Sequence, residues 1–264
     1  MRWLAALGSL ALAAAPSQPA PVLKRIASDE ARQGVASDGR HVYAIDNSRI
    51  GKYRIADGKK LGEWRGDPAL IPHLNSCTVV GRELVCASSN YPAVPQTSSV
   101  EVFDLTRLRH VRSHSFGIAE GSLTALDRHD GAWWAVFAHY DGRGGVPGKD
   151  NAYSQLVRLD GEFRPIARWT FPAPVLAAMK PYSASGASWT ADGRLAVSGH
   201  DKPEIYVLAL PQGGSVLRLL STVAVASEGQ AIDWEPNMSA RLWTISRERR
   251  ELVLSDLSGV LPKR

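Results

Sequence analysis

Short runs of apolar residues, alternating with polar ones and separated by turn residues, recur along most of the chain. The clearest example spans residues 185–216, where Asp192-Gly193 lies between two apolar runs and Pro211 ends a third. Its strands are predicted at residues 186–189, 195–198, 204–208 and 216–220. Asp-Gly supplies the positive φ that a two-residue hairpin needs. Four short antiparallel strands within about 40 residues are typical of one blade of a β-propeller.

The same unit recurs four more times. The other copies begin near Gly34, Ser76, Gly121 and Gly229. The last copy stops after its third strand at residues 251–254, while residues 21–26 precede the first copy and have no assigned partner. This N-terminal strand can complete the last blade and close the ring, which removes exposed sheet edges. The sequence therefore predicts an all-β propeller of five blades with four antiparallel strands each, or six blades if residues 140–182 hold two units.

Composition and the first residues add a cellular location. The chain has 264 residues, 44% of them apolar and 22% charged, which fits one globular propeller domain over residues 21–264. Residues 1–20 carry Arg2, then an apolar run to Ala15, and are predicted to be a secretory signal peptide. No later stretch is long enough to cross a bilayer. We expect a periplasmic or secreted monomer without membrane insertion.

Two cysteines, Cys77 and Cys86, are the only ones in the sequence. If Gly81-Arg82 forms the tip of a hairpin, the two cysteines face each other at a non-hydrogen-bonded position, where side chains come closest. In an oxidising compartment this arrangement predicts a disulfide. The alternative is a metal-binding or catalytic thiol.

The formal net charge is +5, and basic residues gather weakly at 107–112 and 247–250. The first segment alternates with apolar residues, and the second contains an interleaved carboxylate. Neither is a concentrated basic patch, so no nucleic-acid partner is predicted.

The two ends of the predicted propeller differ in composition. Turns between first and second strands and between third and fourth strands are tight and polar. Connections from second to third strands, and from one blade to the next, emerge at the other end and carry His, Glu, Asn and Tyr. Three long connections, residues 92–99, 141–154 and 172–181, emerge there too. Long loops at one end of a rigid scaffold usually carry function, so the site is predicted at this end.

The side chains predicted for this site fall into three groups. His139, His200, Tyr140 and Arg247 are the candidate catalytic residues. Glu120, Glu228 and Asp201, together with His139 and His200, are the candidate ligands of a divalent metal ion whose identity is open. Gln33, Asn47, Asn75, Asn90 and Gln230 are the candidate substrate-binding residues. The structural alternative is that Glu120 and Glu228 accept backbone N–H groups and that each histidine is part of the packing.

Two stretches carry a family resemblance. SGASWTADGRLAVSGHDKPEIYVL resembles the strand–turn–strand unit of gluconolactonase-like (regucalcin-like) propellers, and EGQAIDWEPNMSARLWTI resembles their EG-x-x-W-D opening unit. The resemblance implies a divalent-metal lactone hydrolase in which Glu228 and Asp201 are the matching carboxylates. Ser185 stands where that family has Asn. The family's Glu-Gly unit is also in the last repeat of this chain rather than in the first. ARQGVASDG is similar to the first blade of five-bladed glutaminyl cyclotransferases.

We therefore expect a metal-assisted, lactonase-like hydrolase, or a related enzyme, acting on a small hydroxylated or anionic substrate. In this reading Arg247 holds a carboxylate while Tyr140 or a histidine transfers a proton. The alternative is a non-catalytic propeller that binds a small polar molecule, a glycan or a protein partner.

Overall fold

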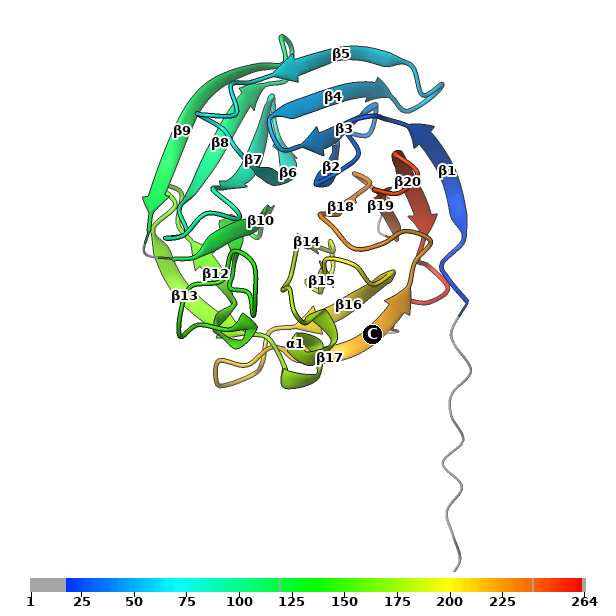
Figure 1. The fold of residues 1–264 in the computed structure, drawn as a ribbon. Coiled ribbons are helices and arrows are strands. Elements are labelled where there is room, and N and C mark those ends of the chain that lie inside the picture. Colours follow the sequence, from blue (N-terminus) through cyan, green and yellow to red (C-terminus); the bar gives the residue numbers. More distant parts are fainter. Residues whose placement is uncertain (1–17, 119, 239, 263–264) are drawn as a thin grey trace, which may run out of the picture.

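Five four-stranded antiparallel sheets form a ring around a central opening (Figure 1). The structure is a computed structural model that describes residues 18–118, 120–238 and 240–262. Most of the predicted signal peptide, residues 1–17, lies outside the described residues. The chain is thus a five-bladed β-propeller, as the repeat predicted, and residues 140–182 do not hold an additional blade.

The blades are numbered I to V in chain order, and strands are given from the innermost outwards. Blade I contains β2 (Gly34–Ser37), β3 (His41–Asp46), β4 (Arg49–Arg54) and β5 (Lys60–Arg65). Blade II contains β6 (Leu74–Val80), β7 (Glu83–Ser89), β8 (Ser98–Asp104) and β9 (Arg109–Gly117). Blade III contains β10 (Ser122–His129), β11 (Ala132–Ala138), β12 (Gln155–Leu159) and β13 (Pro165–Thr170). Blade IV contains β14 (Gly186–Trp189), β15 (Leu195–Ser198), β16 (Glu204–Ala209) and β17 (Arg218–Ala224). Blade V contains β18 (Asp233–Trp234), β19 (Arg241–Ser246), β20 (Glu251–Asp256) and β1 (Val22–Ala27).

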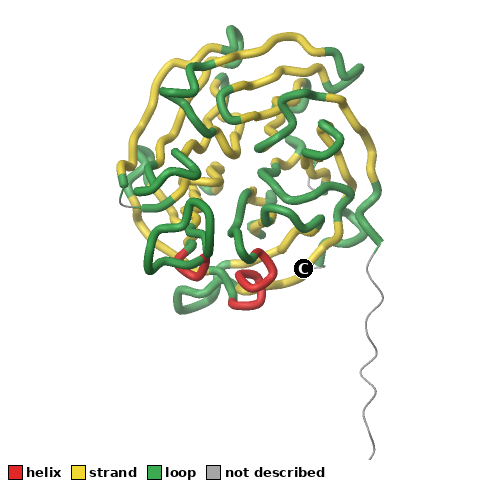
Figure 2. The backbone as a smooth tube through the Cα atoms, viewed as in Figure 1, coloured by secondary structure: helices red, strands yellow, loops and turns green. Residues whose placement is uncertain are grey.

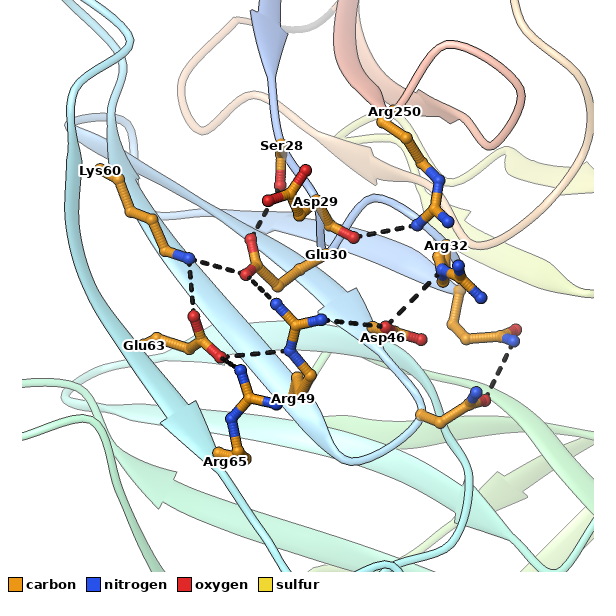
Figure 3. Close-up of polar contacts among 12 residues, drawn as sticks. Ser28, Asp29, Glu30, Arg32, Asp46, Arg49, Lys60, Glu63, Arg65 and Arg250 are labelled. Atoms are coloured by element: carbon orange, nitrogen blue, oxygen red, sulfur yellow. Dashed lines mark hydrogen bonds and ion pairs between the residues drawn. The ribbon is translucent and has the colours of Figure 1, made fainter.

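The N-terminal strand closes the ring, as predicted. β1 pairs with β20 from Val22 opposite Ser255 to Ala27 opposite Glu251, so the first strand of the chain is the outer strand of the last blade. The connection from β1 to β2 carries Glu30, whose side chain is fully buried. Glu30 accepts hydrogen bonds from Arg49 and Lys60 of blade I at 2.6 and 2.7 Å (Figure 3). It also accepts one from Tyr53 Oη of the same blade at 2.6 Å. This ion-pair cluster ties the closing connection to blade I.

Apolar packing between neighbouring blades supplies the core. Each of the five blade interfaces has its own cluster, for example Tyr43 and Ile45 of blade I against Leu84 and Phe103 of blade II. Middle strands such as β3 and β11 are buried along nearly their whole length because they are covered by a blade on each side. The ring therefore fixes where each strand ends.

Glycines allow three blades to meet near the axis. A Cβ atom on Gly34 would lie 2.7 Å from Ala231 Cβ, and one on Gly186 would lie 2.6 Å from Ala231 Cα. Larger residues at these two positions would force the inner strands of blades I, IV and V apart.

The long connections emerge together at one end of the ring, which we call the loop face. The β11–β12 connection contains a short 3-10 helix, η1 (Asn151–Tyr153), and the β13–β14 connection contains α1 (Ala173–Met179). Figure 2 shows these two red segments on the same side of the ring, and Asn151 Nδ2 donates to Leu176 O at 2.8 Å. The sequence predicted only a long loop at 172–181. Val175, Leu176 and Met179 fold it into a helix by entering the core between blades III and IV.

The predicted disulfide is present. Cys77 and Cys86 are direct cross-strand partners on β6 and β7, and their sulfur atoms are bonded. Among the described residues, no helix is both long enough and apolar enough to cross a membrane.

Candidate functional site

The ends of β15 and β19 bring three predicted site residues together. β15 ends at Ser198 and β19 at Ser246, so Gly199 to Asp201 and Arg247 reach the loop face from adjacent blades. Arg247 Nη2 donates to His200 O at 2.8 Å and to Asp201 Oδ1 at 3.0 Å. Arg247 Nη1 lies 3.3 Å from His200 Nε2. His200, Asp201 and Arg247 are called the dyad–guanidinium cluster below.

Hydrogen bonding assigns the tautomer of His200. Its Nδ1 lies 2.5 Å from Asp201 Oδ1, which can only accept when ionised. Arginine is a donor only, so Nε2 must present its lone pair to Arg247, and Nδ1 must carry the proton given to Asp201. Burial and the charge of Arg247 lower the pKa of His200, and Asp201 opposes them only in part. His200 is therefore a neutral base at neutral pH.

Asp201 stays ionised beside this imidazole. Burial alone would raise its pKa, but the hydrogen bond from Arg247 and the interaction with His200 outweigh burial and lower it. Arg247 Nε is buried and has no hydrogen-bond partner in the part of the chain that the structure describes. The guanidinium thus retains a donor beyond those used by His200 and Asp201.

Aromatic residues from three blades surround the cluster. The Tyr182 ring stacks on His200 with centroids 4.0 Å apart. On neighbouring connections of the loop face, His73 packs on Tyr91, which packs edge-on against Tyr140, both pairs with ring centroids 5.3 Å apart. Burial and the charge of His200 lower the pKa of His73 to about 4. Burial and Tyr182 raise the pKa of Tyr91. The pKa values of His73 and Tyr91 thus respond to the charge of His200 and to Tyr182 respectively.

A small pocket adjoins His200. It has a volume of about 190 Å³, and its polar lining includes His200, Asp201, Lys180, Lys202 and Tyr206. Each cation at this pocket has a carboxylate partner: Lys180 pairs with Asp141 at 3.1 Å, Lys202 lies 3.9 Å from Glu204, and the neighbouring Arg247 pairs with Asp201 at 3.0 Å. The pocket suits a compact polar molecule.

The predicted metal ligands do not converge. Both Glu120 carboxylate oxygens accept from Arg168, at 2.6 and 3.0 Å, and Glu228 Oε1 accepts from the Glu248 backbone N–H at 2.8 Å. His139 is buried beside Tyr153, with ring centroids 6.2 Å apart, and is not bonded to the dyad–guanidinium cluster. Over the described residues, no group of three or more His, Cys, Asp or Glu side chains could hold a metal ion. These side chains do not fit a divalent ion as they stand, and the metal stays a prediction.

The predicted substrate-binding amides make contacts within the scaffold. Gln33 Nε2 donates to Asn47 Oδ1 at 3.1 Å, and Asn75 Nδ2 donates to Leu123 O at 2.7 Å, which joins blades II and III. Asn90 holds the 92–97 segment by donating to Pro95 O at 2.9 Å and accepting from Thr97 N at 2.8 Å. Gln230 is buried, and its backbone carbonyl oxygen accepts a hydrogen bond from Ser198 Oγ at 2.5 Å. A role in substrate binding stays a prediction for all five.

Sequence reasoning missed Tyr182, Tyr91 and His73 as members of this site. All three lie in segments that it placed at the functional end. The aromatic residues there were the signal, but the paths of the connections that bring them together are not encoded in the strand pattern.

Comparison with known proteins supports the fold. No family profile and no curated protein sequence matches the chain. A luciferin-regenerating enzyme is similar in structure, with a TM-score of 0.57, 10% identity, and coverage of 88% of this chain and 93% of that one. The PQQ-bound aldose sugar dehydrogenase of Streptomyces coelicolor gives a TM-score of 0.56 at 13% identity, covering 92% and 83%. A chain of the mitotic checkpoint complex gives 0.50 at 11% identity, covering 97% and 98%. At these identities the likeness is one of fold alone.

Proposed function

We propose that the protein is a hydrolase of small anionic esters or lactones, with the dyad–guanidinium cluster as its reactive centre. The observation that carries the proposal is an imidazole held between Asp201 on Nδ1 and Arg247 on Nε2. A base oriented by a carboxylate and placed beside a fixed cation is the arrangement that general-base hydrolysis requires.

The chemistry follows from these positions. A water molecule takes the place of Arg247 Nη1 at His200 Nε2, because their 3.3 Å contact is long for a hydrogen bond yet too short to hold a molecule between the two atoms. His200 Nε2 removes a proton from the water as its oxygen bonds to the carbonyl carbon. Arg247 stabilises the negative charge that develops on the carbonyl oxygen. The carbon–oxygen bond of the ester then breaks, and the imidazolium returns the proton to the leaving alkoxide.

The cationic lining of the adjoining pocket supports an anionic substrate. In this proposal Lys180 and Lys202, which line the pocket, exchange their partners Asp141 and Glu204 for a substrate carboxylate next to the scissile bond. The pocket volume of about 190 Å³ favours a compact molecule. Export to the periplasm or the exterior is part of the proposal, and the Cys77–Cys86 disulfide supports it.

The test is a hydrolysis assay of the purified protein on lactones and esters with and without a carboxylate. His200→Gln should lower kcat by at least about 100-fold, since general-base catalysis contributes that much. Arg249→Gln is the matched control, because Arg249 is exposed and adjacent to Arg247. Turnover unchanged in His200→Gln would refute the proposal. Binding of carboxylates without turnover in the wild type would support the non-catalytic alternative instead.

The divalent metal is tested in the same preparation. Metal analysis of the purified protein and assays after chelation should show hydrolysis that survives metal removal, because His200 and Arg247 act without an ion. Loss of activity on chelation, restored by one divalent ion, would favour the metal-assisted alternative.

A further inference from the structure

A larger depression lies on the loop face beside the β11–β12 connection. It has a volume of about 820 Å³ and is lined by residues between Tyr140 and Tyr153 and by Lys180. Three of the lining residues are glycines, Gly142, Gly145 and Gly148. Glycines leave backbone N–H and C=O groups open to close approach by a ligand. Neither His200 nor Arg247 lines this depression.

Tyr153 forms an aromatic wall of the depression. Tyr153 is 53% exposed, whereas the other tyrosines of the chain are buried or half-buried. The backbone beneath it is fixed, because Asp150 accepts from Ala152 N at 3.0 Å and Asn151 Nδ2 donates to Leu176 O and Tyr182 O at 2.8 and 3.1 Å. A rigidly mounted aromatic face packs well against the C–H face of a sugar ring.

The polar groups around Tyr153 include both acceptors and an unused cation. Asp141 and Asp150 line the depression, and Lys180 pairs with Asp141 at 3.1 Å. The backbone N–H of Lys149 donates to Val146 O at 3.0 Å, but its ammonium group has no hydrogen-bond or ion-pair partner in the described part of the chain. Its charge, together with burial, lowers the pKa of His139. His139 Nδ1 is buried next to Tyr153 and has no hydrogen-bond partner among the residues that the structure describes. Sugar hydroxyls need both donors and acceptors, and the lining supplies two lysines and two aspartates. Lys180 is paired with Asp141, so the Lys149 ammonium is the cation that an anionic group would contact.

We propose that this depression binds an acidic saccharide, with a sugar ring packed on Tyr153 and a sugar carboxylate held by Lys149. This site goes beyond the proposed hydrolase and does not depend on it. Lys180 also lines the pocket at His200, so a longer saccharide would extend towards the dyad–guanidinium cluster. Only that extension rests on the proposed function.

The experiment is calorimetric titration of the full chain with three probes: a galacturonic acid trimer, a galactose trimer and acetate. The galacturonic acid trimer should bind at least about tenfold more tightly than the neutral trimer, and acetate should not bind measurably. Equal binding of the neutral trimer would overturn the assignment of an acidic ligand. Saturable binding of acetate with the same affinity would show a simple anion site and overturn the saccharide.

Substitutions at Tyr153 and Lys149 test whether the saccharide binds in this depression. Tyr153→Ala should weaken binding at least about tenfold, whereas Tyr153→Phe retains the ring and should keep most of the affinity. Lys149→Gln should weaken binding about fivefold, and Lys59→Gln, an exposed lysine in the β4–β5 turn, should leave it unchanged. Unchanged affinity in Tyr153→Ala, with the protein folded, would refute the site.

The same preparations separate the two proposals. His200→Gln should lose hydrolysis and keep saccharide binding. A wild type that binds the galacturonic acid trimer through Tyr153 without hydrolysing any ester would refute the hydrolase and uphold the saccharide site. A hydrolase whose Tyr153→Ala variant binds the trimer normally would refute the saccharide site alone.

Discussion

His200 is the residue on which the proposed chemistry depends. Its proton is on Nδ1, its lone pair on Nε2 faces a guanidinium, and its pKa lies below the ordinary 6.5 because of burial and Arg247. The reactive form is neutral and predominates above that pKa. We predict that kcat/KM is level at neutral pH and falls as the pH drops below 6.5, measured from pH 4.5 to 8. A rate that rises on acidification would contradict the assignment of His200 as the base.

His73 makes a second pH-dependent contribution, to stability. Its pKa is about 4 in the folded protein and 6.5 in an exposed histidine. Between these values the unfolded chain binds a proton that the folded chain excludes, so the free energy of unfolding falls as the pH drops from 6.5 towards 4. His73→Gln should show a smaller fall than the wild type in urea unfolding at pH 7 and 4.5. Identical falls in the two proteins would exclude His73 as a contributor.

At the residue scale, sequence reasoning found the members of the site that directly end a strand. His200, Asp201 and Arg247 follow β15 and β19 at once, so the alternation of apolar positions placed them. Glu120 and Glu228 were assigned because they precede the innermost strands of their blades at the same end. Partners such as Arg168 lie on an outer strand whose register the sequence does not specify. Tyr182 and His73 lie at the ends of connections between blades, where no periodicity guides a prediction.

Among the elements, β1 and the connection that follows it hold the ring closed. β1 is an outer strand with mostly exposed side chains, so its pairing with β20 contributes little apolar burial. The buried carboxylate of Glu30 adds hydrogen bonds and ion pairs to blade I directly after this strand. Burial alone would raise its pKa, but hydrogen bonds from Lys60 and Tyr53 and the charge of Lys60 lower it to about 2.

Removing the Glu30 carboxylate charge should therefore destabilise the closure. We expect Glu30→Gln to lower the free energy of unfolding by about 3 kcal/mol, because it leaves buried donors and a cation without their partner. Glu63→Gln is the matched control, since Glu63 contacts the same Lys60 and Arg49 but is partly exposed, and it should cost less than about 1 kcal/mol. Equal losses in urea unfolding would mean that burial of Glu30 is not what matters.

The pattern of apolar and polar residues did not predict the helix α1. α1 spans seven residues, too few for a helical repeat to stand out, and its helical form comes from core contacts of Val175, Leu176 and Met179. The strands were predictable because each hairpin carries its own turn residues. Counting outwards from the hairpin turn likewise predicted that Cys77 lies opposite Cys86.

For the whole molecule, the end of the channel opposite the loop face is tied together by a buried carboxylate. Asp127 of β10 accepts from Trp189 N at 2.7 Å, from Ser188 Oγ at 3.1 Å and from Thr78 Oγ1 at 3.3 Å, so it joins blades II, III and IV. Burial raises its pKa. The ring therefore depends on inner-strand contacts as well as on its closing strand.

Substitution of this carboxylate should loosen the whole ring. Asp127→Ala leaves several buried donors unpaired and is expected to lower the free energy of unfolding by about 3 kcal/mol or more. Thr78→Ala, which removes only one of the donors to Asp127, should cost about 1 kcal/mol. A loss for Asp127→Ala no larger than that for Thr78→Ala, measured by chemical unfolding, would contradict its role as a three-blade link.

The number of blades and the closing strand were predictable at this scale because the chain repeats and one strand was missing from the last copy. Which loops of different blades lie next to each other was not predictable, because that depends on how the blades are rotated about the axis. Gly34 and Gly186 against Ala231 show how close that approach is.

Nitrogen-detected NMR of the histidine rings at neutral pH, with and without a small carboxylate ligand, tests the central claim most directly. The account predicts that His200 is neutral with its proton on Nδ1, that it titrates below pH 6.5, and that Nε2 shifts when the ligand binds. A proton on Nε2, titration above pH 6.5, or no response to any carboxylate would contradict a reactive base held between Asp201 and Arg247.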